Sequence, residues 1–329
     1  MALRLPTTFR GYLFEKFGDA LQEIKLRTDL THAPLGPSQI RVKVFTTALN
    51  PVDHKLVEVG ARFMPTAPTA ENPCRLGFDA AGKVVEVGAD VSNVKIDDEV
   101  LGMAYFGSTG TWAEYAVLEA ANVVHKPTSL SFGQAAGLPL VGQTTYQALT
   151  THGHFQAGQR VLILGGSTAT GAIAIQVAKA LGASFVAATA STRNVDFVKS
   201  FGADQVIDYT SEKWANILEA HSIDLIYDCG VEPKAWDEGA QSVLTKDTGR
   251  LVTIGLPITP SESPIGATYT RMGGRPSQSD LQALVSLADS GKLTIPVDSV
   301  YAFEDLLDAV AAQKAGRARG KIILSIASE

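Results

Sequence analysis

Hydrophobic positions along the chain change their spacing near residue 130. Before that point they alternate with polar ones. In 39–46 the residues Ile40, Val42 and Val44 fall on one face of an extended segment. Short strand-like segments follow, separated by Gly, Asp and Asn, at 83–88, 98–103 and 114–119. Together with a first strand at RGYLF, this spacing predicts a compact, barrel-like β domain.

After residue 130, apolar strands alternate with helical segments. The expected strands are 160–165, 184–190, 205–209, 223–230 and 249–255, and the expected helices are 170–182, 193–201, 212–220 and 234–244. Repeated βα units with hydrophobic strands predict a doubly wound parallel sheet, with its ligand site at the carboxyl ends of the strands.

The remaining part of the chain is expected to differ from this pattern. The segment 256–270 has loop-like composition, and 278–329 predicts two amphipathic helices around a strand. The chain ends in the apolar segment KIILSIA, which has no obvious partner in the parallel sheet. We therefore assign the tail to the amino-terminal β domain.

The segment 160–182 predicts a phosphate-binding turn. An apolar run over 161–164 stops at Gly165 and Gly166, and a loop of small residues follows. The next residues have helical spacing and share one face: Ala174, Val177, Ala178 and Leu181. Glycine allows the backbone to approach a ligand, and the free N–H groups of the first helical turn favour a phosphate. An ordinary tight βα turn is the alternative interpretation.

Composition limits the classes of function. The 329 residues are 45% hydrophobic and 19% charged, which predicts a folded protein of two domains. Because the net charge is −6 and there is no long basic run, we do not expect nucleic acid as a partner. Because no apolar run is long enough to span a bilayer, we do not expect a membrane partner either. The two cysteines, Cys74 and Cys229, are typical of a reducing compartment, and the amino terminus is too short for a transit peptide, so we expect a cytoplasmic protein.

Six segments in order resemble one family over essentially the whole length. They are NPVDHKLVEVG (50–60), GFDAAGKVVEVGADVSNVKIDDEVLG (77–102), AAGLPLVGQTTYQAL (135–149), GGSTATGAIAIQVAKALGA (165–183), FGADQVIDY (201–209) and ARGKIILS (318–325). The chain resembles the zinc-independent, zeta-crystallin-like quinone oxidoreductases of the medium-chain dehydrogenase/reductase superfamily.

This resemblance implies an α/β protein with a Rossmann doubly wound sheet and a GroES-like β-barrel catalytic domain. The Rossmann domain is expected over 128–269, and the catalytic domain over 1–127 and 270–329. The family binds NADPH in a cleft between the two domains. We also expect a homodimer or homotetramer.

A zinc site is not expected. Zinc-dependent alcohol dehydrogenases of this superfamily carry a cysteine where Asn50 stands and a histidine where Phe78 stands, and they hold a second zinc with four cysteines. Two cysteines cannot supply such ligand sets. His152 and His154 lie in a predicted loop and are interpreted as surface residues. Without zinc, the protein should reduce acceptors that accept a hydride readily rather than oxidise alcohols.

The end of the second Rossmann strand predicts the coenzyme. An NAD enzyme places an acidic residue there for the ribose 2′-hydroxyl. This strand ends instead in Ser191, Thr192 and Arg193, and an arginine with hydroxyls suits a 2′-phosphate. Relatives often carry a lysine where Asn194 stands, so Arg193 is expected to replace it, and Tyr209 matches the family tyrosine that closes over the same phosphate. Alternatively, Arg193 only begins a helix and Tyr209 only packs at a strand end.

The phosphate loop is less rich in glycine than in relatives. Its predicted cofactor-binding residues are Gly166, Ser167, Thr168, Ala169, Thr170 and Gly171. Thr168 and Ala169 stand where relatives carry glycine, so the backbone is less free to reach positive φ. The hydroxyls of Ser167, Thr168 and Thr170 are expected to donate to phosphate oxygens instead.

The resemblance places further residues at the cofactor: Thr144 beside the nicotinamide, Val231 with Cys229 and Gly230 at one strand end, Gly255 at the next strand end, and Gly320 and Lys321 near the carboxyl end. Asn50 is expected either to contact nicotinamide or substrate or to serve only as a turn residue before Pro51. Asn50 and Tyr105 are the catalytic candidates, with Lys55 a further neighbour. Asp53 and Cys229 are expected to be structural.

The sequence therefore predicts NADPH-dependent, metal-free reduction of quinones or other conjugated carbonyls. A first alternative is an enoyl-thioester or 2-alkenal double-bond reductase. The tyrosine that fatty-acid enoyl reductases of this type usually use as proton donor is missing from 61–79. A second alternative, of another class, is a non-catalytic NADPH-binding sensor, because a fold does not determine a function.

Overall fold

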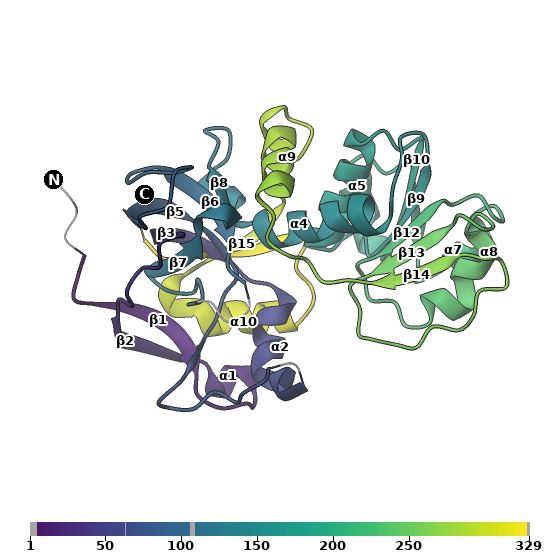
Figure 1. Cartoon of the computed structure of the whole chain (residues 1–329). Coiled ribbons are helices and arrows are strands. Elements are labelled where there is room, and N and C mark those ends of the chain that lie inside the picture. The colour runs from purple at the N-terminus through teal and green to yellow at the C-terminus, as the bar shows by residue number, and fades with distance from the viewer. Residues whose placement is uncertain (1–4, 63, 106–108, 328–329) are drawn as a thin grey trace. The chain divides into compact units, whose positions relative to one another are not determined.

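The computed structural model describes residues 5–62, 64–105 and 109–327 (Figure 1). The chain forms two compact units. Unit 1 comprises Met1–Leu140, Pro276–Val285 and Pro296–Glu329, and unit 2 comprises Val141–Arg275 and Ser286–Ile295. No helix within the described residues has the length and apolar character needed to cross a lipid bilayer.

Unit 1 is built on two β-sheets. The larger has the order β15-β16-β3-β5-β6-β8, with β7 also paired to β3, and the smaller has the order β2-β1-β4. The strands are β1 (Thr8–Phe14), β2 (Lys25–Thr31), β3 (Gln39–Ala48), β4 (Cys74–Arg75), β5 (Asp79–Val87), β6 (Glu99–Met103), β7 (Tyr115–Glu119), β8 (Val123–His125), β15 (Val297–Ala302) and β16 (Lys321–Ser325). The last strand of the chain, β16, pairs with β15 in parallel and with β3 in antiparallel orientation.

Strand β3 shows why this sheet forms. Ile40, Val42 and Val44 are fully buried in the core of unit 1, as their alternation predicts. Between them, Arg41 is also buried, and its Nε lies 2.8 Å from Oε2 of Glu86 on β5. The helical segments of unit 1 are α1 (Ala20–Glu23), α2 (Pro51–Val59), η1 (Gly60–Arg62), η2 (Ala120–Asn122), α3 (Phe132–Ala136), η6 (Phe303–Asp305) and α10 (Leu306–Lys314).

Unit 2 contains a six-stranded parallel sheet. Its order is β11-β10-β9-β12-β13-β14, with β9 (Arg160–Leu164), β10 (Phe185–Ala190), β11 (Gln205–Asp208), β12 (Leu225–Asp228), β13 (Arg250–Thr253) and β14 (Thr268–Arg271). In chain order this is 3-2-1-4-5-6, the Rossmann arrangement, and the order reverses between β9 and β12. Figure 1 shows α5 (Ala169–Ala180) on one side of this sheet and α7 (Trp214–Ile217) with α8 (Gln241–Val243) on the other. The predicted fold class is confirmed.

Several predicted elements have other bounds. The segment 212–220 contains only the four residues of α7, because Leu218 turns to an extended conformation and is buried in the core of unit 2. The expected helix over 193–201 is a tight turn, η4 (Thr192–Asn194), followed by α6 (Val195–Lys199). The expected helix over 234–244 is divided into η5 (Ala235–Ala240) and α8. The prediction of loop structure up to residue 270 is wrong at its end, since β14 (Thr268–Arg271) is the sixth strand of the sheet.

Two further helices complete the described chain. Helix α4 (Pro139–Gln147) continues into a wider turn, η3 (Ala148–His152), before β9. Helix α9 (Gln278–Asp289) precedes β15, which confirms the prediction of two helices around a strand in the tail.

Candidate functional site

A buried polar cluster lies in unit 1, and Asn50, Asp79 and Lys321 form it. Their exposed fractions are 1%, 0% and 2%. Lys321 Nζ lies 2.6 Å from Asn50 Oδ1 and 3.2 Å from Asp79 Oδ2, and Asn50 Nδ2 donates to the same Asp79 oxygen at 2.8 Å. Each polar group thus has a partner, as buried charges require.

Local structure explains how residues so far apart in sequence meet. Asn50 stands directly before Pro51, the first residue of α2, and Asp79 begins β5. Gly320 has φ +115°, and a side chain there would collide with the carbonyl oxygen of Pro296. This glycine lets Lys321 enter β16 with its N–H donating to that carbonyl at 2.8 Å.

The sequence predicts Asn50 and Lys321 as site residues, and the structure brings them into contact. Asp79 is missed by the sequence reasoning, although it lies in the quoted motif GFDAAG. Its second oxygen, Oδ1, accepts the backbone N–H of Leu140 at 2.7 Å. Tyr105, the other catalytic candidate, lies two residues beyond β6 and is 41% exposed.

Asp53 supports Asn50 from within the same helix. Its Oδ2 accepts the backbone N–H of Asn50 at 2.7 Å, so the carboxyl group anchors the start of α2. Burial raises the pKa of Asp53 to about 8. These contacts give Asp53 a structural role, as predicted. Lys55, on the same helix, is exposed.

The donor set of this cluster does not suit zinc. Asn50 offers an amide, Phe78 offers no donor, and the ammonium of Lys321 lies among the oxygens that a metal ion would need. Within residues 5–62, 64–105 and 109–327, no group of three or more His, Cys, Asp and Glu side chains could hold a metal ion. A tetrahedral zinc site requires three or four such ligands.

In unit 2, the predicted phosphate loop connects β9 to α5. Gly165 has φ +87°, and a Cβ there would lie 2.6 Å from the Cα of Gly230. Thr189, on β10, holds the loop: its Oγ1 accepts from Gly165 N at 2.9 Å, and its carbonyl accepts from Gly166 N at 2.8 Å. The loop therefore lies at the carboxyl ends of adjacent strands, where a Rossmann sheet binds phosphate.

The replacement of glycine by Thr168 does not strain the loop. Thr168 has φ −71° and is the N-cap of α5; its Oγ1 accepts from Gly171 N and donates to Gly165 O, both at 2.9 Å. In this structure the single proton of this hydroxyl is donated inside the loop, to Gly165 O. Elsewhere in the loop, the N–H groups of Ser167, Ala169 and Thr170 donate to no acceptor among the described residues.

The turn after β10 brings together most of the residues predicted for the 2′-phosphate. Asn194 is buried, and its Nδ2 donates to Ser191 Oγ at 3.2 Å, which leaves the proton of Ser191 available to another acceptor. Arg193 is exposed in this turn. Tyr209 is 57% exposed, and its N–H donates to the carbonyl of Ala190 at 3.1 Å, so the end of β11 lies beside the end of β10.

A buried carboxylate shapes the neighbouring edge of the sheet. Asp228, at the end of β12, accepts from Glu232 N at 3.0 Å and from Thr253 Oγ1 at 2.9 Å, and burial raises the pKa of Asp228. Thr253 Oγ1 in turn accepts from Gly255 N at 3.0 Å. Val231, which lies between Asp228 and Glu232 in the sequence, has φ +56°, an uncommon conformation for a β-branched residue. Asp228 thus links the two strand ends that carry Val231 and Gly255.

Thr144 lies on α4 against a glycine segment that the sequence reasoning missed. A Cβ on Gly274 would collide with Thr144 Oγ1. Gln147 holds this segment, because its amide donates to Arg275 O at 2.8 Å and accepts from Arg275 N at 3.0 Å. The close approach of Gly274 therefore restricts the side chain of Thr144.

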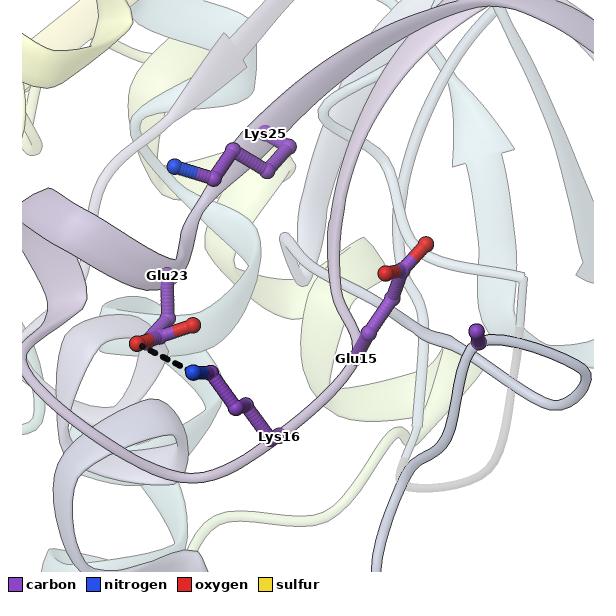
Figure 2. A pocket seen from close by; sticks show the side chains of 5 residues that line it. Glu15, Lys16, Glu23 and Lys25 are labelled. Atoms are coloured by element: carbon purple, nitrogen blue, oxygen red, sulfur yellow. Dashed lines mark ion pairs between the residues drawn. The ribbon is translucent and has the colours of Figure 1, made fainter.

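Figure 2 shows a hollow on unit 1, and none of the site residues described above lines it. It measures about 270 Å³ and is lined by Glu15, Lys16, Glu23, Lys25 and Ala70. Lys16 Nζ lies 3.5 Å from Glu23 Oε1. None of the predicted site residues lines this hollow.

Two family models match the chain. Residues 36–128 match the alcohol dehydrogenase GroES-like domain, and residues 201–324 match a model described as zinc-binding dehydrogenase. The chain is 32% identical to 2-methylene-furan-3-one reductase of Solanum lycopersicum, over 98% of this chain and 80% of that protein. It is also 32% identical to the chloroplastic NADPH-dependent alkenal/one oxidoreductase of Arabidopsis thaliana, over 97% of this chain and 80% of that protein.

Solved structures agree. The quinone oxidoreductase of Coxiella burnetii superposes with a TM-score of 0.84 at 28% identity, covering 97% of this chain and all of that one. The chain therefore belongs to the quinone oxidoreductase family of the medium-chain dehydrogenase/reductase superfamily, as its motifs predict. It is an oxidoreductase.

Proposed function

We propose that the protein transfers a hydride from NADPH to quinones or other conjugated carbonyls without a metal ion. The observation that carries this proposal is the carboxyl edge of the sheet in unit 2. There the glycine loop follows β9, and the turn of Ser191 and Arg193 follows β10. These two strands are parallel neighbours in the sheet. A dinucleotide requires a pyrophosphate site and a ribose site in this relation.

The residues of unit 2 are proposed to bind the coenzyme through distinct groups. The N–H groups of Ala169 and Thr170, in the first turn of α5, and that of Ser167, directly before the N-cap, would donate to the pyrophosphate. Ser191 and Arg193 would hold the 2′-phosphate, with Tyr209 beside it. Gly166, Thr168 and Gly171 would contribute by shaping the loop, and Thr144, Val231 and Gly255 would contact the nicotinamide.

In unit 1, Asn50 and Lys321 are proposed polar contacts of the nicotinamide or the acceptor, and Gly320 positions Lys321. NADPH supplies the hydride from C4 of its nicotinamide. The protein would contribute mostly by holding the reactants together and excluding water. A reduced quinone can take its proton from solvent, and Tyr105 is the candidate donor from the protein.

The absence of zinc chemistry is part of the proposal. The family model's description names zinc, but an amide, an apolar side chain and an ammonium stand where zinc ligands would be needed. We therefore derive no step through a metal ion. Dialysis against EDTA is expected to leave the reductase activity unchanged.

Reduction of the double bond of 2-alkenals or enoyl thioesters is the second candidate, because a relative that matches 97% of this chain is named an alkenal/one oxidoreductase. Both chemistries use the same hydride donor. Oxidation of NADPH should be followed with ortho- and para-quinones, enones, 2-alkenals and a crotonyl thioester. Turnover of the thioester faster than of quinones would reverse the order of the candidates, and coenzyme binding without turnover would favour a sensor.

A cytoplasmic location and assembly into a homodimer or homotetramer remain proposals from the sequence. Size-exclusion chromatography with light scattering would measure the assembly. A monomer would contradict that part.

A further inference from the structure

An acidic side chain lies at the turn after β10, although it comes from the neighbouring strand. Asp208 ends β11 and pairs with Ala190, the last residue of β10, in the parallel ladder. Thr192 Oγ1 lies 2.5 Å from Asp208 Oδ2. The turn after β10 contains no acidic residue of its own. A carboxylate from β11 nevertheless lies within hydrogen-bond distance of this turn.

Other hydrogen bonds fix this carboxylate. Asp208 Oδ1 accepts from Thr210 N at 3.0 Å and from Thr210 Oγ1 at 2.7 Å. The hydrogen bonds from the hydroxyls of Thr192 and Thr210 lower the pKa of Asp208. The group is thus a fixed negative charge at neutral pH.

The same contacts decide which hydroxyls of the turn can donate. A hydroxyl has one proton, and Thr192 gives its proton to Asp208. Ser191 accepts from Asn194 instead and keeps its own. An anion bound at this turn would therefore receive hydrogen bonds from Ser191 and Arg193, while Thr192 faces the carboxylate.

We propose that Asp208 is a specificity-determining residue for the coenzyme, and that it reduces the preference for NADPH over NADH. The inference rests on the proposed function, in which this turn binds the 2′-phosphate. A carboxylate so close to the turn repels a dianionic phosphate there. The ribose of NADH carries a hydroxyl instead, which can donate to a carboxylate.

The test is the variant Asp208→Asn, which removes the charge and keeps an oxygen acceptor for Thr210 N. Dissociation constants for NADPH and NADH should be measured at low salt by quenching of tryptophan fluorescence. NADPH is expected to bind about three- to tenfold more tightly than to the native protein, while NADH binds equally or less tightly. The gain should shrink at high salt, because screening weakens the repulsion that was removed.

Glu219→Gln is the matched control. Glu219 is exposed in the connection that leads into the amino end of β12, and its replacement changes the net charge by the same amount. This control should not alter the NADPH/NADH ratio. Asp208→Ser, with a shorter neutral side chain, should change the ratio in the same direction as Asp208→Asn.

An unchanged or reduced NADPH/NADH affinity ratio in both Asp208 variants would overturn the inference. That outcome is distinct from failure of the proposed function, which would show in the native protein. If the native protein bound neither coenzyme, the proposed function and the inference would both be rejected. If the native protein bound NADPH but the NADPH/NADH ratio did not rise in the Asp208 variants, the inference would be rejected and the proposed function would stand.

Discussion

Lys321 and Asp79 are almost completely buried, and each is the oppositely charged partner of the other at 3.2 Å. Removing one partner of a buried pair leaves an uncompensated charge, which typically costs about 3–5 kcal/mol. Lys321→Met is therefore expected to lower the free energy of unfolding by about this amount. The double variant Lys321→Met with Asp79→Asn removes both charges and should regain a large part of the loss.

Urea unfolding of the native protein, both single variants and the double variant measures this coupling. A double variant that loses the sum of the two single losses would show that the two side chains do not interact, contrary to the 3.2 Å contact.

Asp53 predicts a pH dependence of stability. In the unfolded chain an aspartic acid ionises near pH 4, whereas Asp53 in the folded protein keeps its proton up to about pH 8. Its contribution to stability is complete below pH 4 and is lost as the pH rises through 8. Asp53→Asn cannot ionise, so from pH 5 to pH 8 the native protein should lose stability relative to this variant, on the order of 2–4 kcal/mol.

Unfolding midpoints of the two proteins at several pH values test this expectation. Titrating groups elsewhere are shared by both proteins and cancel in the comparison. Parallel pH profiles would show that Asp53 does not titrate in this range.

The proposed role of Arg193 leads to a prediction about the preference for NADPH over NADH. A charge-assisted contact to the 2′-phosphate is typically worth about 1.5–3 kcal/mol, so Arg193→Ala should weaken NADPH roughly ten- to a hundredfold. The affinity for NADH should hardly change, because NADH has no 2′-phosphate. Titration of both coenzymes distinguishes the loss of one contact from a folding defect, which would weaken both alike. An unchanged ratio would remove this side chain from the proposed site.

Candidate site residues could be predicted where a family motif identifies them. They could not be predicted where their role depends on contacts with another strand. Asn50 and Lys321 belong to family motifs, and their contact follows from the pairing of β16 with β3. Asp208 also lies in a motif, VIDY, but its relation to Thr192 depends on the register of β10 and β11. A search for an acid along β10 alone could not find a carboxylate that the adjacent strand provides.

At the scale of elements, the contact between α4 and the segment after β14 makes a sharp prediction. Gly273 and Gly274 both have negative φ, but a Cβ on Gly273 meets open space and one on Gly274 meets Thr144. Gly274→Ala should lower stability by about 1–3 kcal/mol and displace Thr144. Gly273→Ala is the matched control and should be neutral or slightly stabilising.

Thermal unfolding and NADPH titration of both variants measure the two effects. If Gly274→Ala were as stable as Gly273→Ala and bound NADPH equally well, the close approach to Thr144 would have no consequence.

Elements with a long hydrophobic pattern were predictable, and short ones were not. Strand β9 and helix α5 are almost wholly buried, so largely apolar segments bounded by the glycine turn mark them in the sequence. The strand β14 has only partly buried and exposed residues, which removes the apolar run that marks a parallel strand. Helix α7 ends after four residues because Leu218 is needed in the core, a requirement of tertiary packing that local periodicity does not express.

For the whole molecule, the change of hydrophobic spacing near residue 130 predicts the two kinds of sheet. The order of the six parallel strands then follows from the Rossmann pattern. The pairing of β16 within the sheet of unit 1 agrees with the expectation that this strand has no partner in the parallel sheet of unit 2. The positions of the buried carboxylates, Asp79 and Asp228, required the folded chain, because many carboxylates in the sequence carry no mark of burial.

Metal-free hydride transfer from NADPH is the central claim, and an isotope measurement tests it most directly. Protein dialysed against EDTA is mixed with an acyclic enone and NADPH deuterated at C4, with each epimer in a separate reaction. We predict that one epimer alone delivers deuterium to the β-carbon of the saturated ketone, and that EDTA does not change the rate. A product without deuterium from either epimer, or activity that EDTA abolishes, would contradict the proposed function.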